Sequence, residues 1–140
     1  MKKYLFLSLA IAAILFTSCK KDEEEETPST YLKMKIDNGD EISFTAQVTV
    51  VANFVNITGQ VSTEKMISIQ FPKDATGDVS NPSISYTENN QQVITSLNID
   101  DISLNISENN SDHVAGSFTI DYHDDNGGNH TATGSFDLDY

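Results

Sequence analysis

The feature of this sequence that most constrains its fold is a repeated alternation of apolar and polar residues. In the segment 42–50, the apolar residues Ile42, Phe44, Ala46, Val48 and Val50 alternate with Ser43, Thr45, Gln47 and Thr49. A period of two places all the apolar side chains on one face of a β-strand, whereas an amphipathic helix needs a period of 3.6. No segment of useful length between residues 30 and 140 shows the helical spacing. The chain is therefore predicted to be all-β.

The same alternation recurs in eight or nine short segments. Besides 42–50, the expected strands cover 32–36, 55–57, 67–71, 84–86, 102–106, 116–122 and 134–140, whereas 93–99 is ambiguous. Turns are expected at 37–40, near 52–53, at 73–82, at 88–92 and at 108–112. Because polar residues occupy the alternate positions, the strands are expected to be antiparallel with one wet face. We predict a single antiparallel β-sandwich or small β-barrel of about 8–9 strands over residues 30–140. Periodicity alone does not decide between these two architectures.

Two nearly identical strings, GSFTIDY (116–122) and GSFDLDY (134–140), flank a block rich in Asp, Asn, Gly and His. The residues expected on the inner face all have even numbers: Gly116, Phe118, Ile120 and Tyr122 in the first string, and Gly134, Phe136, Leu138 and Tyr140 in the second. Directly opposed residues of an antiparallel pair share a face, so their numbers must add to an even number. The connecting loop must then be odd in length. We predict a three-residue loop, Asn126-Gly127-Gly128, with a glycine in the left-handed region.

The same block contains weak candidates for a divalent-cation site at Asp121, His123 and Asp125. Their alternating spacing is typical of a Ca²⁺ loop. The pattern departs from an EF-hand, which has glycine at the sixth position and glutamate at the twelfth, where this chain has Asn126 and Ala132. The chain is therefore expected to have at most weak affinity for Ca²⁺, and no cofactor is predicted.

The remaining polar residues suggest no active site. The three histidines, His113, His123 and His130, do not converge in the predicted hairpin, and we expect them to be exposed and unlinked. The sequence contains no G-x-S-x-G nucleophile elbow. The adjacent acids at 100–101 and at 124–125 would point to opposite faces of a strand, which rules out an acid/base pair within either dipeptide. Tyr31 and Tyr86 could stack on sugars, although core or rim positions are commoner for tyrosine. We predict that the protein is not an enzyme.

The amino-terminal residues have the organisation of an export signal. Lys2 and Lys3 precede a thirteen-residue run, 4–16, that is apolar except for Ser8. As a helix this run would cover about 20 Å, too short for the roughly 30 Å hydrocarbon core of a membrane. Residues 1–18 are therefore predicted to be a cleaved signal peptide. The string F-T-S-C at 16–19 resembles a bacterial lipobox, and Cys19 is the only cysteine. Lipidation of Cys19 is the predicted modification.

Residues 19–29 are predicted to be the lipidated cysteine followed by a disordered acidic tether. The string CKKDEEEE resembles the acidic export signal of Bacteroidetes-type surface lipoproteins. Removal of residues 1–18 takes away two lysines and no acids, so the formal net charge falls from −13 to −15. The chain contains no arginine, which argues against nucleic-acid binding and leaves the lipid as the expected membrane attachment.

The lipobox, the acidic tether, the strand motif ISIQFP (67–72) and the final GSFDLDY together resemble a family of small Bacteroidetes-type lipoproteins of unknown function. This resemblance implies a β-rich body that ends in a G-x-F hairpin, and it supplies no catalytic residues. We expect a non-catalytic protein lipid-anchored in the bacterial outer membrane, displayed at the cell surface as a binding or structural module for an unknown protein or glycan partner. The alternatives are a lipocalin-like carrier of a small apolar ligand, and a weak divalent-cation-binding module.

Overall fold

The computed structural model describes residues 30–140. The predicted signal peptide (1–18), the predicted lipidation site Cys19 and the predicted tether (19–29) lie outside the described residues. Within residues 30–140, no helix has the length and apolar character needed to cross a membrane.

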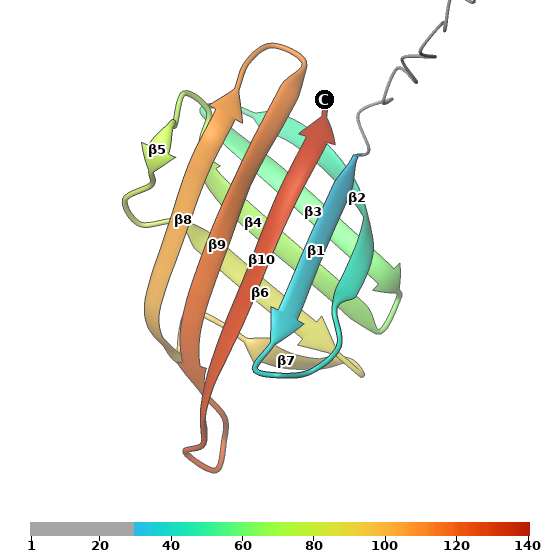
Figure 1. Cartoon of the computed structure of the whole chain (residues 1–140), viewed down its shortest axis with the longest axis vertical. Helices are drawn as coiled ribbons and strands as arrows, with labels where there is room; N and C mark the ends of the chain where they lie inside the picture. Colours follow the sequence, from blue (N-terminus) through green and yellow to red (C-terminus); the bar gives the residue numbers. More distant parts are fainter. Residues whose placement is uncertain (1–29) are drawn as a thin grey trace, which may run out of the picture.

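The described residues form ten β-strands, which confirms the all-β prediction. The strands are β1 (Tyr31–Ile36), β2 (Ile42–Val51), β3 (Phe54–Ser62), β4 (Lys65–Pro72), β5 (Gly77–Asp78), β6 (Ser83–Glu88), β7 (Gln91–Ile94), β8 (Ile99–Asn109), β9 (His113–His123) and β10 (Asn129–Asp139). All pairings are antiparallel, and the strands make one sheet in the order β5-β8-β9-β10-β1-β2-β3-β4-β6-β7. The sheet is curled into a half-barrel (Figure 1).

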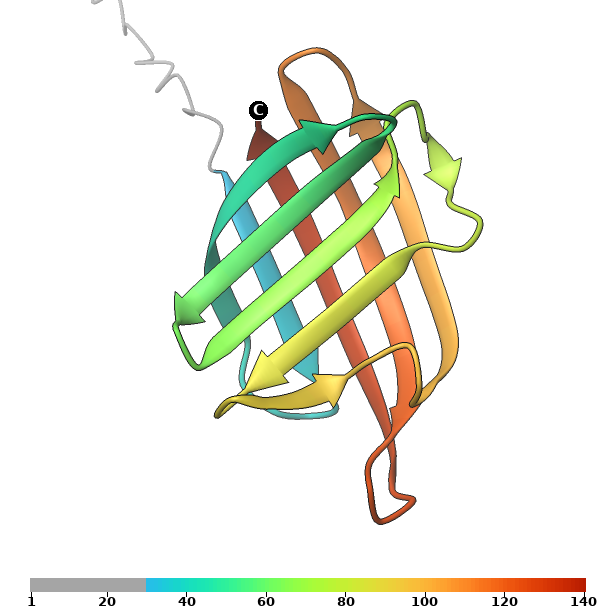
Figure 2. The ribbon, with the colours of Figure 1, turned by 180° about the vertical axis from the view of Figure 1, so that it is seen from behind.

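The curl brings two layers of the same sheet face to face. Strands β8, β9, β10 and β1 form one layer, and β3, β4 and β6 cross behind them, as Figures 1 and 2 show from opposite sides. Strand β2 joins the layers because it changes partner along its length. Its first residues pair with β1 up to Phe44, and from Thr45 onward it pairs with β3.

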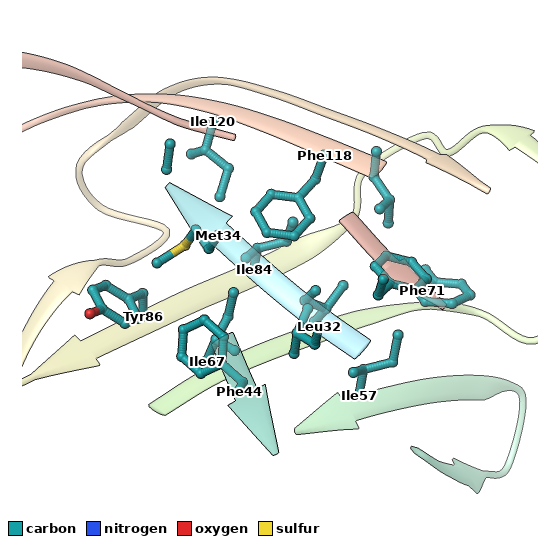
Figure 3. Packing of buried hydrophobic residues seen from close by; sticks show 14 of the residues in the cluster. Leu32, Met34, Phe44, Ile57, Ile67, Phe71, Ile84, Tyr86, Phe118 and Ile120 are labelled. Carbon is teal, nitrogen blue, oxygen red and sulfur yellow. The ribbon is translucent and has the colours of Figure 1, made fainter. Parts of the chain in front are cut away.

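The space between the layers is filled by apolar side chains. Leu32 and Met34 from β1 lie among Ile67, Ile84, Phe118 and Ile120 from both layers (Figure 3). These positions alternate with exposed ones along each strand, as in β4, where Ile67, Ile69 and Phe71 are buried. Tyr86 also belongs to this core and has no exposed surface, so the suggestion that it stacks on sugars is wrong.

The duplicated Gly-x-Phe motif is explained by the pairing of β9 with β10. The register places Gly134 opposite Phe118, and Gly116 opposite Phe136, so each glycine faces the phenylalanine of the other copy. A Cβ added at Gly116 would lie 2.7 Å from Phe136 Cζ, and one added at Gly134 would overlap the Phe118 ring. The two aromatic rings therefore occupy the space that side chains at the glycines would need.

The register of this hairpin confirms the even-numbered pairing and the shared inner face. Phe118, Ile120, Tyr122, Phe136 and Leu138 are buried as predicted. Tyr140 is an exception, because it is 40% exposed and its hydroxyl donates a hydrogen bond to Asn109 Oδ1.

The strand count is higher than predicted. The extra strand, β5, has only two residues and lies inside the predicted loop 73–82, where no alternation can be seen. The ambiguous segment 93–99 divides into the end of β7, a turn and the start of β8. The turn expected at 88–92 is shorter than predicted, since only Asn89 and Asn90 form it, both with positive φ. Two central residues with positive φ are typical of a tight hairpin turn.

Candidate functional site

Two clefts lined by His130 lie at one end of the half-barrel, which we name the His130 end. It comprises the β1–β2 turn (37–41), the β6–β7 turn (89–90), the turn 95–98 and the β9–β10 loop (124–128). The opposite end, which we name the Tyr31 end, comprises the start of β1, the turn 52–53, residues 72–76, the turn 110–112 and Tyr140. Figure 1 shows the start of β1 and Tyr140 at one end and the β9–β10 loop at the other.

His130, the second residue of β10, is held between two carboxylates. Its Nδ1 lies 2.7 Å from Asp37 Oδ2, and its Nε2 lies 3.6 Å from Asp124 Oδ2. The hydrogen bond to Asp37 raises the pKa of His130 above its ordinary value and lowers the pKa of the Asp37 carboxyl group. Both ring nitrogens face negative charge, so the arrangement favours the doubly protonated imidazolium.

Asp37 also connects the β1–β2 turn to β10 through the backbone. Its amide donates a hydrogen bond to the Thr131 carbonyl (2.8 Å), and its Oδ1 accepts one from the Thr131 amide (2.9 Å). Asp37 has a positive φ of 50°, a conformation that aspartate tolerates better than most residues. One residue of the predicted DNGD turn thus fixes both the backbone and the imidazole at the start of β10.

Asp124 organises the β9–β10 loop, which is longer than predicted. Asn129 pairs with His123, so the loop is the five residues 124–128 and the predicted three-residue length is wrong. Asp124 Oδ1 accepts hydrogen bonds from the amides of Asn126 (2.9 Å) and Gly128 (2.7 Å), and these bonds lower the pKa of Asp124. Gly127 has a φ of 78°, which confirms a glycine in the left-handed region.

Two tyrosines lie below this polar cluster. The buried Tyr122 ring stacks on the His130 ring with centroids 5.3 Å apart, and burial raises the pKa of Tyr122. The Tyr86 hydroxyl is buried without a hydrogen-bond partner among the described residues. Burial and the nearby Glu88 carboxylate raise the pKa of Tyr86 to about 12. Both hydroxyl groups therefore stay protonated at neutral pH.

Two clefts adjoin the His130 ring. One has a volume of about 600 Å³ and is lined by Asp37, Asp100, Asp121, Tyr122, Asn129, His130 and Thr131. The other, of about 370 Å³, shares Asp37, Tyr122 and His130 with the first and is completed by Ile36, Glu88, Gln91, Gln92, Val93, Asn98, Asp124 and Asp125. Carboxylates and amides make up much of both linings. Such linings suit small polar or cationic ligands better than apolar or anionic ones.

The structure does not bring together the three weak candidates for a cation site. Asp121 Oδ1 accepts a hydrogen bond from Thr131 Oγ1 (2.7 Å), His123 Nδ1 lies 3.1 Å from Asp100 Oδ1, and Asp125 is exposed in the loop. Across residues 30–140, no group of three or more His, Cys, Asp and Glu side chains has the geometry to hold a metal ion.

The three histidines do not contact one another, but each pairs with an aspartate on another strand or turn, and all three are partly buried and not fully exposed as expected. At the Tyr31 end, His113 Nδ1 lies 3.0 Å from Asp139 Oδ1, and this contact raises the pKa of His113. At the His130 end, His123 pairs with Asp100 and His130 with Asp37. The alternation of β9 and β10 placed the histidines correctly along the strands. It could not identify their partners, since these depend on which strands are neighbours.

Comparison with protein-family models, with curated proteins and with solved structures gives no match for this chain. Its function must therefore be argued from its own residues.

Proposed function

We propose that this chain is a non-catalytic, lipid-anchored protein of the bacterial outer membrane, displayed at the cell surface, whose β domain is a binding or structural module. The observation that carries the proposal is that the predicted lipid attachment site lies next to one end of the domain, while the clefts that contain His130 lie at the other. Cys19 lies only twelve residues before Tyr31, where β1 begins. A lipid on Cys19 would hold the Tyr31 end close to the membrane and leave the His130 end, with its two clefts, facing outward.

The geometry at His130 supports a non-catalytic role. A general base needs a ring nitrogen free to accept a proton from a nucleophile or a water molecule. Here both nitrogens of His130 face carboxylates, and the neighbouring Thr131 hydroxyl donates its hydrogen bond to Asp121 instead. The cluster ties the β1–β2 turn to β10, and it presents a polar surface to a protein, a glycan or a small polar ligand.

A lipocalin-like carrier is the alternative, and the packing of the described core does not favour it. A carrier needs an apolar cavity between the layers. In this half-barrel the layers are in close contact, since a Cβ added at Gly59 would lie 2.5 Å from Leu32 Cδ2. The two clefts at the His130 end lie at the surface and not between the layers, and carboxylates and amides make up much of their linings.

Weak Ca²⁺ binding by the exposed acidic side chains is a further proposal. Calcium titration by calorimetry tests it.

The proposal is tested by changing Cys19→Ser in cells that process lipoproteins. The wild-type protein is expected in the outer-membrane fraction, where added protease should digest it on intact cells. The variant is expected in the soluble fraction with unchanged circular dichroism. A variant that stays with the membrane would contradict the lipid anchor. A wild-type protein that resists protease until the cells are lysed would contradict surface display.

A further inference from the structure

The Tyr31 end carries a row of exposed apolar residues that crosses three neighbouring strands. The register places Val51 of β2 opposite Phe54 of β3, and Phe54 opposite Pro72 of β4. Directly opposed residues share a face, so these three side chains form one continuous row. Val51 is 62% exposed, Phe54 is 45% exposed and Pro72 is also exposed. We name this row of three residues the apolar rim.

Val50 pairs with the buried Val55, so its side chain lies on the opposite face of β2 from Val51. Val50 and Tyr140 are two further exposed apolar residues at this end, outside the row. They are 43% and 40% exposed, and both line a shallow cleft of about 650 Å³ at this end. Backbone hydrogen bonds fix the elements involved: the Lys73 amide donates to the Asn53 carbonyl, and the Tyr140 amide donates to the Asp112 carbonyl. Single exposed apolar side chains are ordinary in soluble proteins, whereas the contiguous row of Val51, Phe54 and Pro72 is a candidate contact surface.

The apolar rim lies at the end from which the predicted tether departs. Tyr31 pairs with Asp137 near the end of β10, and Figure 2 shows the β2–β3 turn at the same end of the molecule as the start of β1. Eleven residues lie between Cys19 and Tyr31, and the twelve Cα–Cα steps from one to the other span about 40 Å at most when fully extended. A lipid on Cys19 would thus keep the rim within reach of the bilayer surface at all times.

Charge decides the kind of membrane contact. The mature chain would have a formal net charge of −15 and no arginine, so an anionic lipid surface would repel it. Lys73 is the only cation among the residues lining the cleft beside the rim, and Asp74 lies next to it. Binding must then come from apolar side chains that enter the interfacial region between the headgroups and the acyl chains.

We propose that the apolar rim docks on the surface of a neutral phospholipid bilayer and orients the domain with its His130 end outward. This inference rests on the lipid anchor proposed above. The rim would give the protein a second attachment to the membrane beside the lipid on Cys19. A single weak attachment to a membrane is strengthened by any neighbouring contact that the tether allows.

The test uses the absence of tryptophan from the chain, which makes one introduced tryptophan a unique fluorescent reporter. Phe54→Trp places the reporter in the rim. Leu97→Trp is the matched control, because Leu97 is 91% exposed, lies in the turn 95–98 at the His130 end and has no such row around it. Both full-length lipidated variants are incorporated into phosphatidylcholine vesicles with and without brominated acyl chains.

The emission of the Phe54→Trp variant is expected to shift to the blue in vesicles and to lose intensity with brominated lipid, while that of the Leu97→Trp variant keeps its wavelength and intensity. Equal, unquenched emission from both variants would overturn the inference. A blue shift that depends on protein concentration without bromine quenching would also overturn it, and would indicate contact with a second copy of the chain.

Hydrogen exchange of the unmodified sequence provides an independent measurement. The amides of residues 50–54 should exchange more slowly in the vesicle-bound lipidated protein than in the soluble Cys19→Ser protein, with residues 95–98 unchanged. Equal exchange at 50–54 in the two proteins would contradict docking. If the lipidated protein does not bind vesicles at all, the lipid anchor itself fails, which is a different result from binding without contact at the rim.

Discussion

The β9–β10 loop at the His130 end and the β2–β3 turn at the Tyr31 end share no residue type apart from asparagine. The first, residues 124–128, is polar and glycine-rich, and Asp124 satisfies two of its backbone amides. The second is flanked by exposed Val51 and Phe54 and places Ala52 at a φ of 53°. The β9–β10 loop is polar, and its own Asp124 side chain supplies hydrogen-bond acceptors for its backbone amides. The β2–β3 turn is flanked by apolar side chains that have no partner among residues 30–140. We therefore propose that the β9–β10 loop faces water and that the β2–β3 turn contacts a bilayer.

The largest expected effect comes from removing the strand that links both ends. Deletion of residues 131–140 removes nearly all of β10, which pairs with β1 and with β9, together with the buried Phe136 and Leu138. Each such large apolar loss costs about 2–5 kcal/mol, against a total stability of about 5–15 kcal/mol for a domain. The truncated chain should show no cooperative thermal transition by circular dichroism. A melting curve like that of the intact chain would refute the central role of β10.

Replacing glycine by alanine at the tip of the β9–β10 loop, and alanine by glycine at the β2–β3 turn, should change the free energy of unfolding in opposite directions. Gly127→Ala introduces a Cβ at a φ of 78° with no atom within 4 Å, so only the backbone conformation is penalised, by about 1 kcal/mol. Ala52→Gly relieves the same kind of penalty and should stabilise the domain by up to about 1 kcal/mol, less the added chain entropy of glycine. Urea titration of both variants measures the free energy of unfolding. Shifts of the same sign would show that the tips do not differ in this way.

Tyr86→Phe tests whether the buried Tyr86 hydroxyl, below the His130 end, lacks a hydrogen-bond partner. The buried Tyr86 hydroxyl has no partner among the described residues, and an unpaired buried polar group costs about 1–3 kcal/mol. Removing it should raise the free energy of unfolding by about 1 kcal/mol in urea titration. A loss of stability would instead mean that the hydroxyl is hydrogen-bonded in solution.

The smallest expected effect is a pH dependence produced at both ends. His130 and His113 have raised pKa values, so their contribution is complete below about pH 6.5, their ordinary pKa, and is lost as pH rises through the folded value. Asp37 and Asp124 have lowered pKa values, so theirs is complete above about pH 3.8 and is lost as pH falls. Stability should be greatest between these limits.

Thermal melts at about pH 5.5 and about pH 8 measure this dependence. The excess negative charge of the chain also lowers stability at higher pH, and single variants separate the two causes. His130→Gln and His113→Gln should each reduce the difference between the two melting temperatures. If both variants keep the full difference, the aspartate contacts of the histidines contribute nothing to it.

How far the sequence predicts this molecule depends on the range of the interactions concerned. Alternation identified the strand class, and parity identified the inner face of β9 and β10, because both follow from neighbouring residues. The loop between them was predicted two residues too short, since its length depends on the hydrogen bonds that Asp124 makes with Asn126 and Gly128. The pair of His130 with Asp37 was missed altogether. It exists because β1 lies next to β10, and periodicity carries no information about strand order.

The position of β10 in the middle of the sheet has a consequence for the order of synthesis. This strand leaves the ribosome after β1 to β9, yet it is inserted between β1 and β9. Until it emerges, β1 lacks one neighbour, and the Gly-x-Phe motif of β9 lacks its counterpart. Pairing of residues so far apart along the chain is slow, because the intervening loop must be closed before the contacts form. The nascent chain should therefore stay open to chaperones and to a translocation channel until residues 129–139 are available, and it should fold only afterwards.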